Sequence, residues 1–127
     1  QAVNRGFYQT EVFHVDATSA EEISRATGAG VNGFRMYVKV IVTGHTSNVA
    51  DGLSIKEVYW SGAQGTAPVE ISTSGSTNDP AITFDVGTSN VIIVKVASGD
   101  GSNTFRGVCK IEWMIPNDFN NNTWVVS

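Results

Sequence analysis

The stretch "GFRMYVKVIVTG", residues 33–44, decides the fold class. From Phe34 to Thr43 its side chains alternate between two faces. One face is apolar throughout and comprises Phe34, Met36, Val38, Val40 and Val42, whereas the other is mixed and comprises Arg35, Tyr37, Lys39, Ile41 and Thr43. Alternation with period two, in a run rich in β-branched residues, is typical of a strand with one buried face. The stretch therefore predicts a long β-strand that covers a hydrophobic core.

Further segments extend this pattern along the chain. Thr104 to Ile115 alternates in the same way, and its apolar face includes Cys109 and Trp113. Shorter strands are predicted at Gly6–Val15, Thr18–Arg25, Leu53–Ser61, Pro68–Ser72, Ala81–Val86 and Asn90–Ala97. Turn signals such as Asp51-Gly52 and Ser74-Gly75 separate them. We therefore predict an all-β fold, a single antiparallel β-sandwich of Greek-key or jelly-roll type with about seven to nine strands. It would span residues 1–115, and residues 116–127 would form an extended C-terminal arm.

Composition and charge exclude several classes of protein. The 127 residues are enough for one domain, 41% are apolar and only 16% are charged. A net charge of −4 and the lack of a Lys/Arg cluster argue against a nucleic-acid binder. No apolar run is long enough to insert into a membrane. The single cysteine cannot form an internal disulfide, which favours synthesis in a reducing cytosol.

Gly28, Gly30 and Gly33 match the G-x-G-x-x-G spacing of dinucleotide-binding turns. Such a site needs a helix after the glycines, so that the helix N-terminus faces the pyrophosphate. Here the strongest strand of the chain follows instead. The glycines therefore indicate a tight turn into the strand, with φ above zero at one or more of them, and no cofactor is expected.

Other chemistry is weakly supported. His14 and His45 are far apart in the sequence and Cys109 stands alone, so no metal site is predicted. The run Ser98–Asn103 could offer Asp100 and Asn103 to an ion or a sugar, but a hairpin turn between its flanking strands explains it better. No G-x-S-x-G nucleophile elbow occurs, so we expect no enzymatic activity.

Aromatic side chains remain as candidates for binding. The consecutive run Val58-Tyr59-Trp60 leaves the faces of its strand ambiguous, and a β-bulge there would explain it. Tyr59 and Trp60 could stack on sugar rings together with contacts from Asp100 and Asn103. They could equally serve core packing or a subunit interface, where Tyr and Trp are also enriched.

Three stretches resemble β-sandwich modules of tailed-bacteriophage virion proteins, such as head-decoration and tail-fibre proteins. They are "GFRMYVKVIVTG" at residues 33–44, "DGLSIKEVYWSG" at 51–62 and "DPAITFDVGTSNVIIVKVASGDGSNTFRGVCKIEW" at 79–113. The resemblance implies a non-enzymatic virion structural protein, made in the bacterial host cytoplasm and displayed on the virion surface. It would assemble on a capsid or tail fibre with other virion proteins, as a homo-oligomer, with a trimer favoured.

Terminal arms could carry that assembly. The residues expected to anchor them are Phe7 and Tyr8 at one end and Phe119, Trp124, Val125 and Val126 at the other. The C-terminal arm could fold back on its own sandwich or dock on a neighbour. The alternative function is a carbohydrate- or receptor-binding module, a fibre tip or lectin, that contacts host surface glycans.

Overall fold

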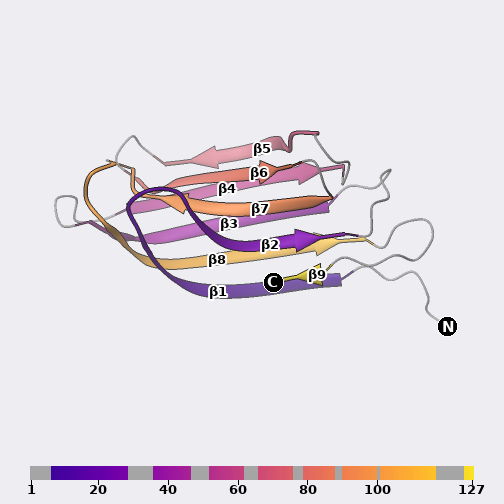
Figure 1. The fold of residues 1–127 in the computed structure, drawn as a ribbon, viewed down its shortest axis with the longest axis horizontal. Coiled ribbons are helices and arrows are strands. Elements are labelled where there is room, and N and C mark those ends of the chain that lie inside the picture. Colours follow the sequence, from indigo (N-terminus) through magenta and orange to yellow (C-terminus); the bar gives the residue numbers. More distant parts are fainter. Residues whose placement is uncertain are drawn as a thin grey trace.

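The computed structural model describes residues 7–28, 36–46, 52–61, 66–75, 79–87, 90–99, 101–116 and 125–127. Within these ranges the chain forms nine β-strands and no helix (Figure 1). The strands are β1 Phe7–Ala17, β2 Glu21–Thr27, β3 Met36–His45, β4 Gly52–Trp60, β5 Val69–Ser74, β6 Ala81–Val86, β7 Val91–Ala97, β8 Phe105–Ile115 and β9 Val125–Val126. The predicted all-β class is confirmed.

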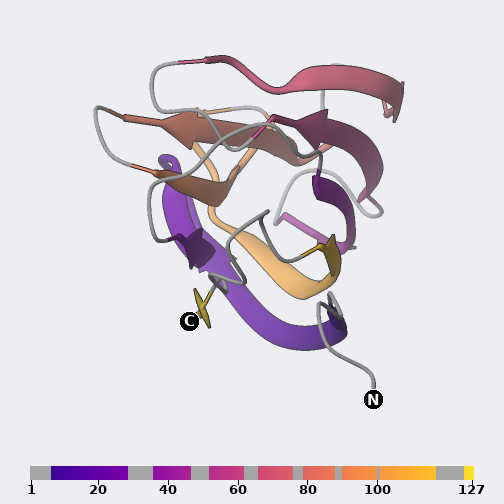
Figure 2. The same ribbon diagram turned by 90° about the vertical axis from the view of Figure 1, so that its right-hand side faces the viewer.

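The strands form two antiparallel sheets that pack as a sandwich (Figure 2). The five-stranded sheet has the order β1-β8-β3-β4-β5, and the four-stranded sheet has the order β6-β7-β2-β9. The pairs β1–β8 and β2–β7 are nested as in a jelly roll. The succession β3-β4-β5 stays in one sheet as a meander, where a regular jelly roll would cross between sheets.

The core lies between the sheets, and β3 and β8 supply much of it. Met36, Val38, Val40 and Val42 are fully buried, as the alternation in residues 34–43 predicts. The apolar face of β8 is equally inaccessible and includes Phe105, Cys109, Ile111, Trp113 and Ile115. From β7 come Ile92, Val94 and Val96. Continuous apolar faces on the central strands of both sheets thus form the core.

Two crossovers between the sheets run side by side at one end of the sandwich. Ser98 N–H donates to the Thr18 carbonyl at 3.1 Å, and the hydroxyls of Thr18 and Thr104 lie 2.8 Å apart. The hairpin predicted between Val91–Ala97 and Thr104–Ile115 is wrong, because β7 and β8 lie in different sheets. The connecting segment still turns tightly, with a positive φ of 77° at Gly101.

The bulge predicted in β4 also lies elsewhere. Along β4 the side chains alternate regularly, with Val58 and Trp60 buried and Tyr59 partly exposed. The pairing of β4 with β5 shifts register between Glu57 and Val58, which face Ser72 and Glu70. The extra residue is therefore Ile71, on the edge strand β5.

The glycines of the G-x-G-x-x-G motif are described in part. Gly28 directly follows β2, its φ is not positive, and its N–H donates to the Asn90 carbonyl at 2.9 Å. Gly30 and Gly33 lie outside the described residues. The predicted left-handed turn is thus not formed at Gly28 and stays a prediction for the other two.

Candidate functional site on the outer face of the five-stranded sheet

A row of aromatic and apolar side chains crosses the outer face of the five-stranded sheet. Cross-strand register aligns one residue from each strand, in the order Tyr8, Met114, Tyr37, Tyr59 and Val69. Directly opposed residues of neighbouring strands point to the same face, so these five side chains stand together. All three tyrosines of the chain belong to this set, which we call the aromatic row.

The aromatic row is accessible along its length. Tyr8 is 59% exposed, Met114 52% and Val69 46%, while Tyr37 and Tyr59 are partly exposed. Strands in a sheet are spaced at about 4.8 Å, so the row extends over roughly 19 Å. It is therefore long enough to contact an extended ligand or the surface of another protein.

A second, polar row runs parallel to it, two residues away along β1, β8, β3 and β4 and three residues away along β5, where Ile71 is the extra residue. Its members are Thr10, Glu112, Lys39, Glu57 and Ser72. The two rows are joined where the Tyr37 hydroxyl donates to Glu57 Oε2. The Ser72 hydroxyl donates to Glu57 Oε1 at 2.6 Å. This polar row gives the face carboxylate acceptors and a cation next to the rings.

The two joined residues have shifted pKa values of opposite sign. Burial of the phenol and its hydrogen bond to Glu57 raise the pKa of Tyr37 to about 12. Hydrogen bonds from Ser72 and Tyr37, with the nearby Lys39 charge, lower the pKa of Glu57. At neutral pH the pair is thus a neutral phenol donating to a carboxylate.

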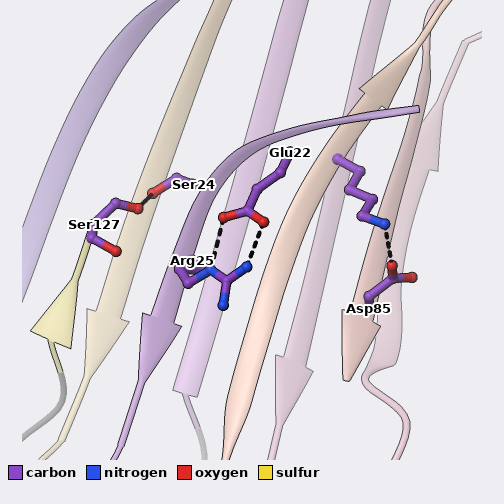
Figure 3. Close-up of polar contacts among 6 residues, drawn as sticks. Glu22, Ser24, Arg25, Asp85 and Ser127 are labelled. Atoms are coloured by element: carbon purple, nitrogen blue, oxygen red, sulfur yellow. Dashed lines mark hydrogen bonds and ion pairs between the residues drawn. The ribbon is translucent and has the colours of Figure 1, made fainter. Parts of the chain in front are cut away.

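The outer faces of the two sheets differ in character. On the five-stranded sheet, Val12, Leu53 and Val108 add exposed apolar area to the same outer face, on the far side of the polar row. On the four-stranded sheet the outer face carries ion pairs (Figure 3). Arg25 binds Glu22 with two contacts of 2.5 and 2.7 Å, and Lys95 lies 2.6 Å from Asp85. The outer face of the five-stranded sheet also carries ion pairs, Arg106 with Asp16 and Lys110 with Glu112, so the two faces differ in the larger number of exposed apolar side chains on the five-stranded sheet.

Of the predicted ligand residues, Tyr59 lies in the aromatic row, but Trp60 does not face solvent. Trp60 is fully buried, and its indole N–H donates to the Thr66 carbonyl at 2.6 Å. Its ring cannot stack on a sugar, so its assignment to a glycan site is corrected to core packing.

Asn103 lies at the end of the sandwich, away from the aromatic row. It lines a hollow of about 410 Å³ with His45, Thr46, Ser102, Thr104 and Arg106. Asp100 lies outside the described residues.

The predicted assembly residues are also dispersed. Tyr8 is part of the aromatic row, and Phe7 pairs with Ile115 through its backbone. Val125 and Val126 form β9 on the edge of β2, where Val126 packs against the core and Val125 is 64% exposed. The end of the arm therefore folds back on its own sandwich. Phe119 and Trp124 lie outside the described residues, and the domain boundary at residue 116 stays a prediction.

Tyr37 and Met114 were missed as surface residues of interest. Each lies on the mixed face of a strongly amphipathic strand. This position alone indicates only that the side chain is exposed to solvent. Their significance comes from register, since Met114 lies between Tyr8 and Tyr37 in space. Pairing across such long sequence separations cannot be deduced from local pattern.

We also searched the described residues for a metal site, a membrane-spanning helix and a reactive thiol. Among them, no group of three or more His, Cys, Asp or Glu side chains is placed to hold a metal ion. Nor does this part of the chain contain a helix that is long and apolar enough to cross a membrane. Burial raises the pKa of the Cys109 thiol to about 12, which disfavours the nucleophilic thiolate.

Comparison with known proteins gives one distant structural match. No protein-family model matches the chain, and no curated protein matches it. The tailspike protein of Acinetobacter phage vB_ApiP_P1 aligns with a TM-score of 0.48 and 17% sequence identity. The alignment covers 93% of this chain and 22% of the tailspike chain. Similarity at this level assigns neither a family nor a function.

Proposed function

We propose that this chain is a non-enzymatic structural module of a bacteriophage virion, which assembles through the outer face of its five-stranded sheet. The aromatic row is the observation that carries the proposal. Exposed tyrosine, methionine and valine side chains are costly to leave hydrated, and Tyr and Met are enriched where proteins associate. The virion setting is supported by the likeness of residues 33–44, 51–62 and 79–113 to phage β-sandwich modules.

The favoured occupant of this face is a second copy of the chain, paired through a two-fold axis and not through the three-fold axis of the trimer that the resemblance implies. In the polar row the signs alternate, because Lys39 lies between Glu112 and Glu57 in register. A two-fold axis between β3 and β4 would set Lys39 of each copy against Glu57 of the other. The face is thus complementary to itself in charge as well as apolar, as a two-fold interface requires.

Sedimentation of the full chain over a range of concentrations tests this. We expect self-association, weakened about thirtyfold or more by Tyr59→Ser with Met114→Ser, because both residues lie on strands that overlap across this axis and truncating each costs about 1 kcal/mol or more. Thr83→Ala, on the outer face of the four-stranded sheet, is the matched control and should associate normally. A chain that stays monomeric at every concentration would contradict assembly between copies.

A second candidate function is glycan binding at the same face. The pairing of a tyrosine row with a row of carboxylates and hydroxyls favours it, since rings stack on sugars while Glu112, Glu57 and Ser72 can accept or donate hydrogen bonds to sugar hydroxyls. A glycan array with the wild-type chain and Tyr59→Ala separates the two functions. Specific binding that Tyr59→Ala removes would support the glycan function, and an array without signal would count against it.

A further inference from the structure

The edge of β2 holds the last residues of the chain through a short antiparallel ladder. Ala26 faces Val126 and Thr27 faces Val125. One residue further, Arg25 and Ser127 exchange both backbone hydrogen bonds, each at 2.9 Å. The contact is therefore made by three residues on each side, and it is independent of the aromatic row.

Two buried side chains of β2, Ser24 and Ala26, lie against the last strand. Ser24 is 1% exposed, and its hydroxyl lies 2.9 Å from the Ser127 carbonyl oxygen (Figure 3). The small side chain of Ala26, fully buried, leaves room for Val126 to pack against the core. The packing of Val126 favours a strand with valine at this position, whereas the Ser24 contact is with the backbone and is available to any strand in this register.

A polar cluster holds Ser24 in place from the opposite sheet. Glu11 Oε1 on β1 lies 3.1 Å from the Ser24 hydroxyl and also accepts from the Trp113 indole N–H at 3.3 Å. Glu11 and Trp113 belong to the five-stranded sheet and Ser24 to the four-stranded one. Contacts with the five-stranded sheet thus hold the edge of β2 in place, and the geometry of this edge does not depend on β9 alone.

We propose that the β2 edge is a strand-acceptor site that also takes residues 125–127 of a second copy, so that neighbouring copies are linked by exchanged C-terminal strands. The same backbone and side-chain contacts form within one chain or between two, so exchange leaves the number of bonds unchanged. Few contacts must break for it, and Val125 already stands 64% exposed. This inference rests on the proposed assembly function and adds a second contact between copies, the exchanged strand.

Cysteine trapping in the full chain tests the exchange. One preparation carries Thr27→Cys and the other Val125→Cys, at positions that face each other across the ladder. After mixing and oxidation with oxidised glutathione, strand exchange yields a covalent dimer of the two variants, increasing with protein concentration. Cys109 is fully buried and stays out of the reaction. A mixture of Thr27→Cys with Thr83→Cys, exposed on the same sheet but not a partner, measures dimers formed by collision.

Competition provides the second measurement. Excess synthetic peptide with the sequence of residues 117–127 should lower the dimer yield, and a scrambled peptide should not. A dimer yield equal to that of the Thr83→Cys mixture, or one insensitive to the peptide, would overturn the exchange. Adding Tyr59→Ser with Met114→Ser to both variants separates the two proposals, because strand exchange should survive this double substitution while association through the sheet face is weakened. If covalent trapping fails in chains that still self-associate, strand exchange is contradicted while association through the sheet face is not.

Discussion

Gly44 on β3 and Gly107 on β8 face each other across the five-stranded sheet and leave no room for a side chain on either strand. A Cβ on Gly107 would lie 2.1 Å from the Thr43 carbonyl oxygen, and one on Gly44 would lie 2.2 Å from the Arg106 carbonyl oxygen. The Phe105 ring also approaches Gly44, to 2.8 Å from the position of such a Cβ. The pair lets two central strands meet closely beneath a core aromatic ring.

Gly107→Ala should therefore destabilise the protein by about 1–3 kcal/mol, because backbone atoms on the neighbouring strand cannot move aside cheaply. Urea unfolding of the two proteins measures this as a lower midpoint with the slope unchanged. Gly87→Ala is the control, since nothing lies within 4 Å of its added methyl group. Equal midpoints for Gly107→Ala and wild type would refute the close approach.

Much of this fold follows from local pattern, and the failures have specific causes. The burial of Met36 and Trp113 is predictable because their strands have one unbroken apolar face. Along β4 the inner face is interrupted by Ser54 and Lys56, which bond to the Pro80 and Ile82 carbonyls at 2.6 and 3.3 Å. Polar residues on the inner face weaken the alternation, so the sequence leaves the faces of this strand ambiguous and does not separate the buried Trp60 from the partly exposed Tyr59.

The aromatic row could not be predicted from the sequence for a different reason. Tyr8 and Tyr59 are both apparent as aromatic residues in strands, but nothing local indicates that Met114 lies between Tyr8 and Tyr37. The sheet order that aligns them depends on which strands the core brings together. The wrong hairpin between β7 and β8 has the same origin, since adjacency in sequence does not fix pairing across a sandwich.

Tyr37 should ionise at higher pH than an ordinary phenol on titration with base. Its pKa of about 12 in the folded chain lies above the ordinary value of 10, so the folded state holds its proton more tightly. The resulting stability is complete below pH 10 and is lost as pH rises towards 12. Absorbance titration of phenolate in wild type and Tyr37→Phe checks this. Identical curves at the alkaline end would show that Tyr37 is not the late-ionising group.

Cys109 should resist thiol reagents until the sandwich unfolds. The side chain is fully buried and its pKa is raised to about 12 by burial, so accessible thiolate is scarce in the native state. Labelling by iodoacetamide at increasing urea should follow the global unfolding transition measured by circular dichroism. Rapid labelling without denaturant would mean that β8 opens locally.

Trp60→Ala should lower the free energy of unfolding by about 3–5 kcal/mol, because it removes a fully buried indole and leaves a cavity. The same substitution leaves the Thr66 carbonyl without its indole donor. Tyr59→Ala, on the outer face, should cost less than about 1 kcal/mol. Urea unfolding compares them directly. If glycan binding exists, its loss in Trp60→Ala would report unfolding, whereas its loss in a folded Tyr59→Ala would report the face itself. A Trp60→Ala chain as stable as wild type would place the indole outside the core and return Trp60 to the candidate ligand residues.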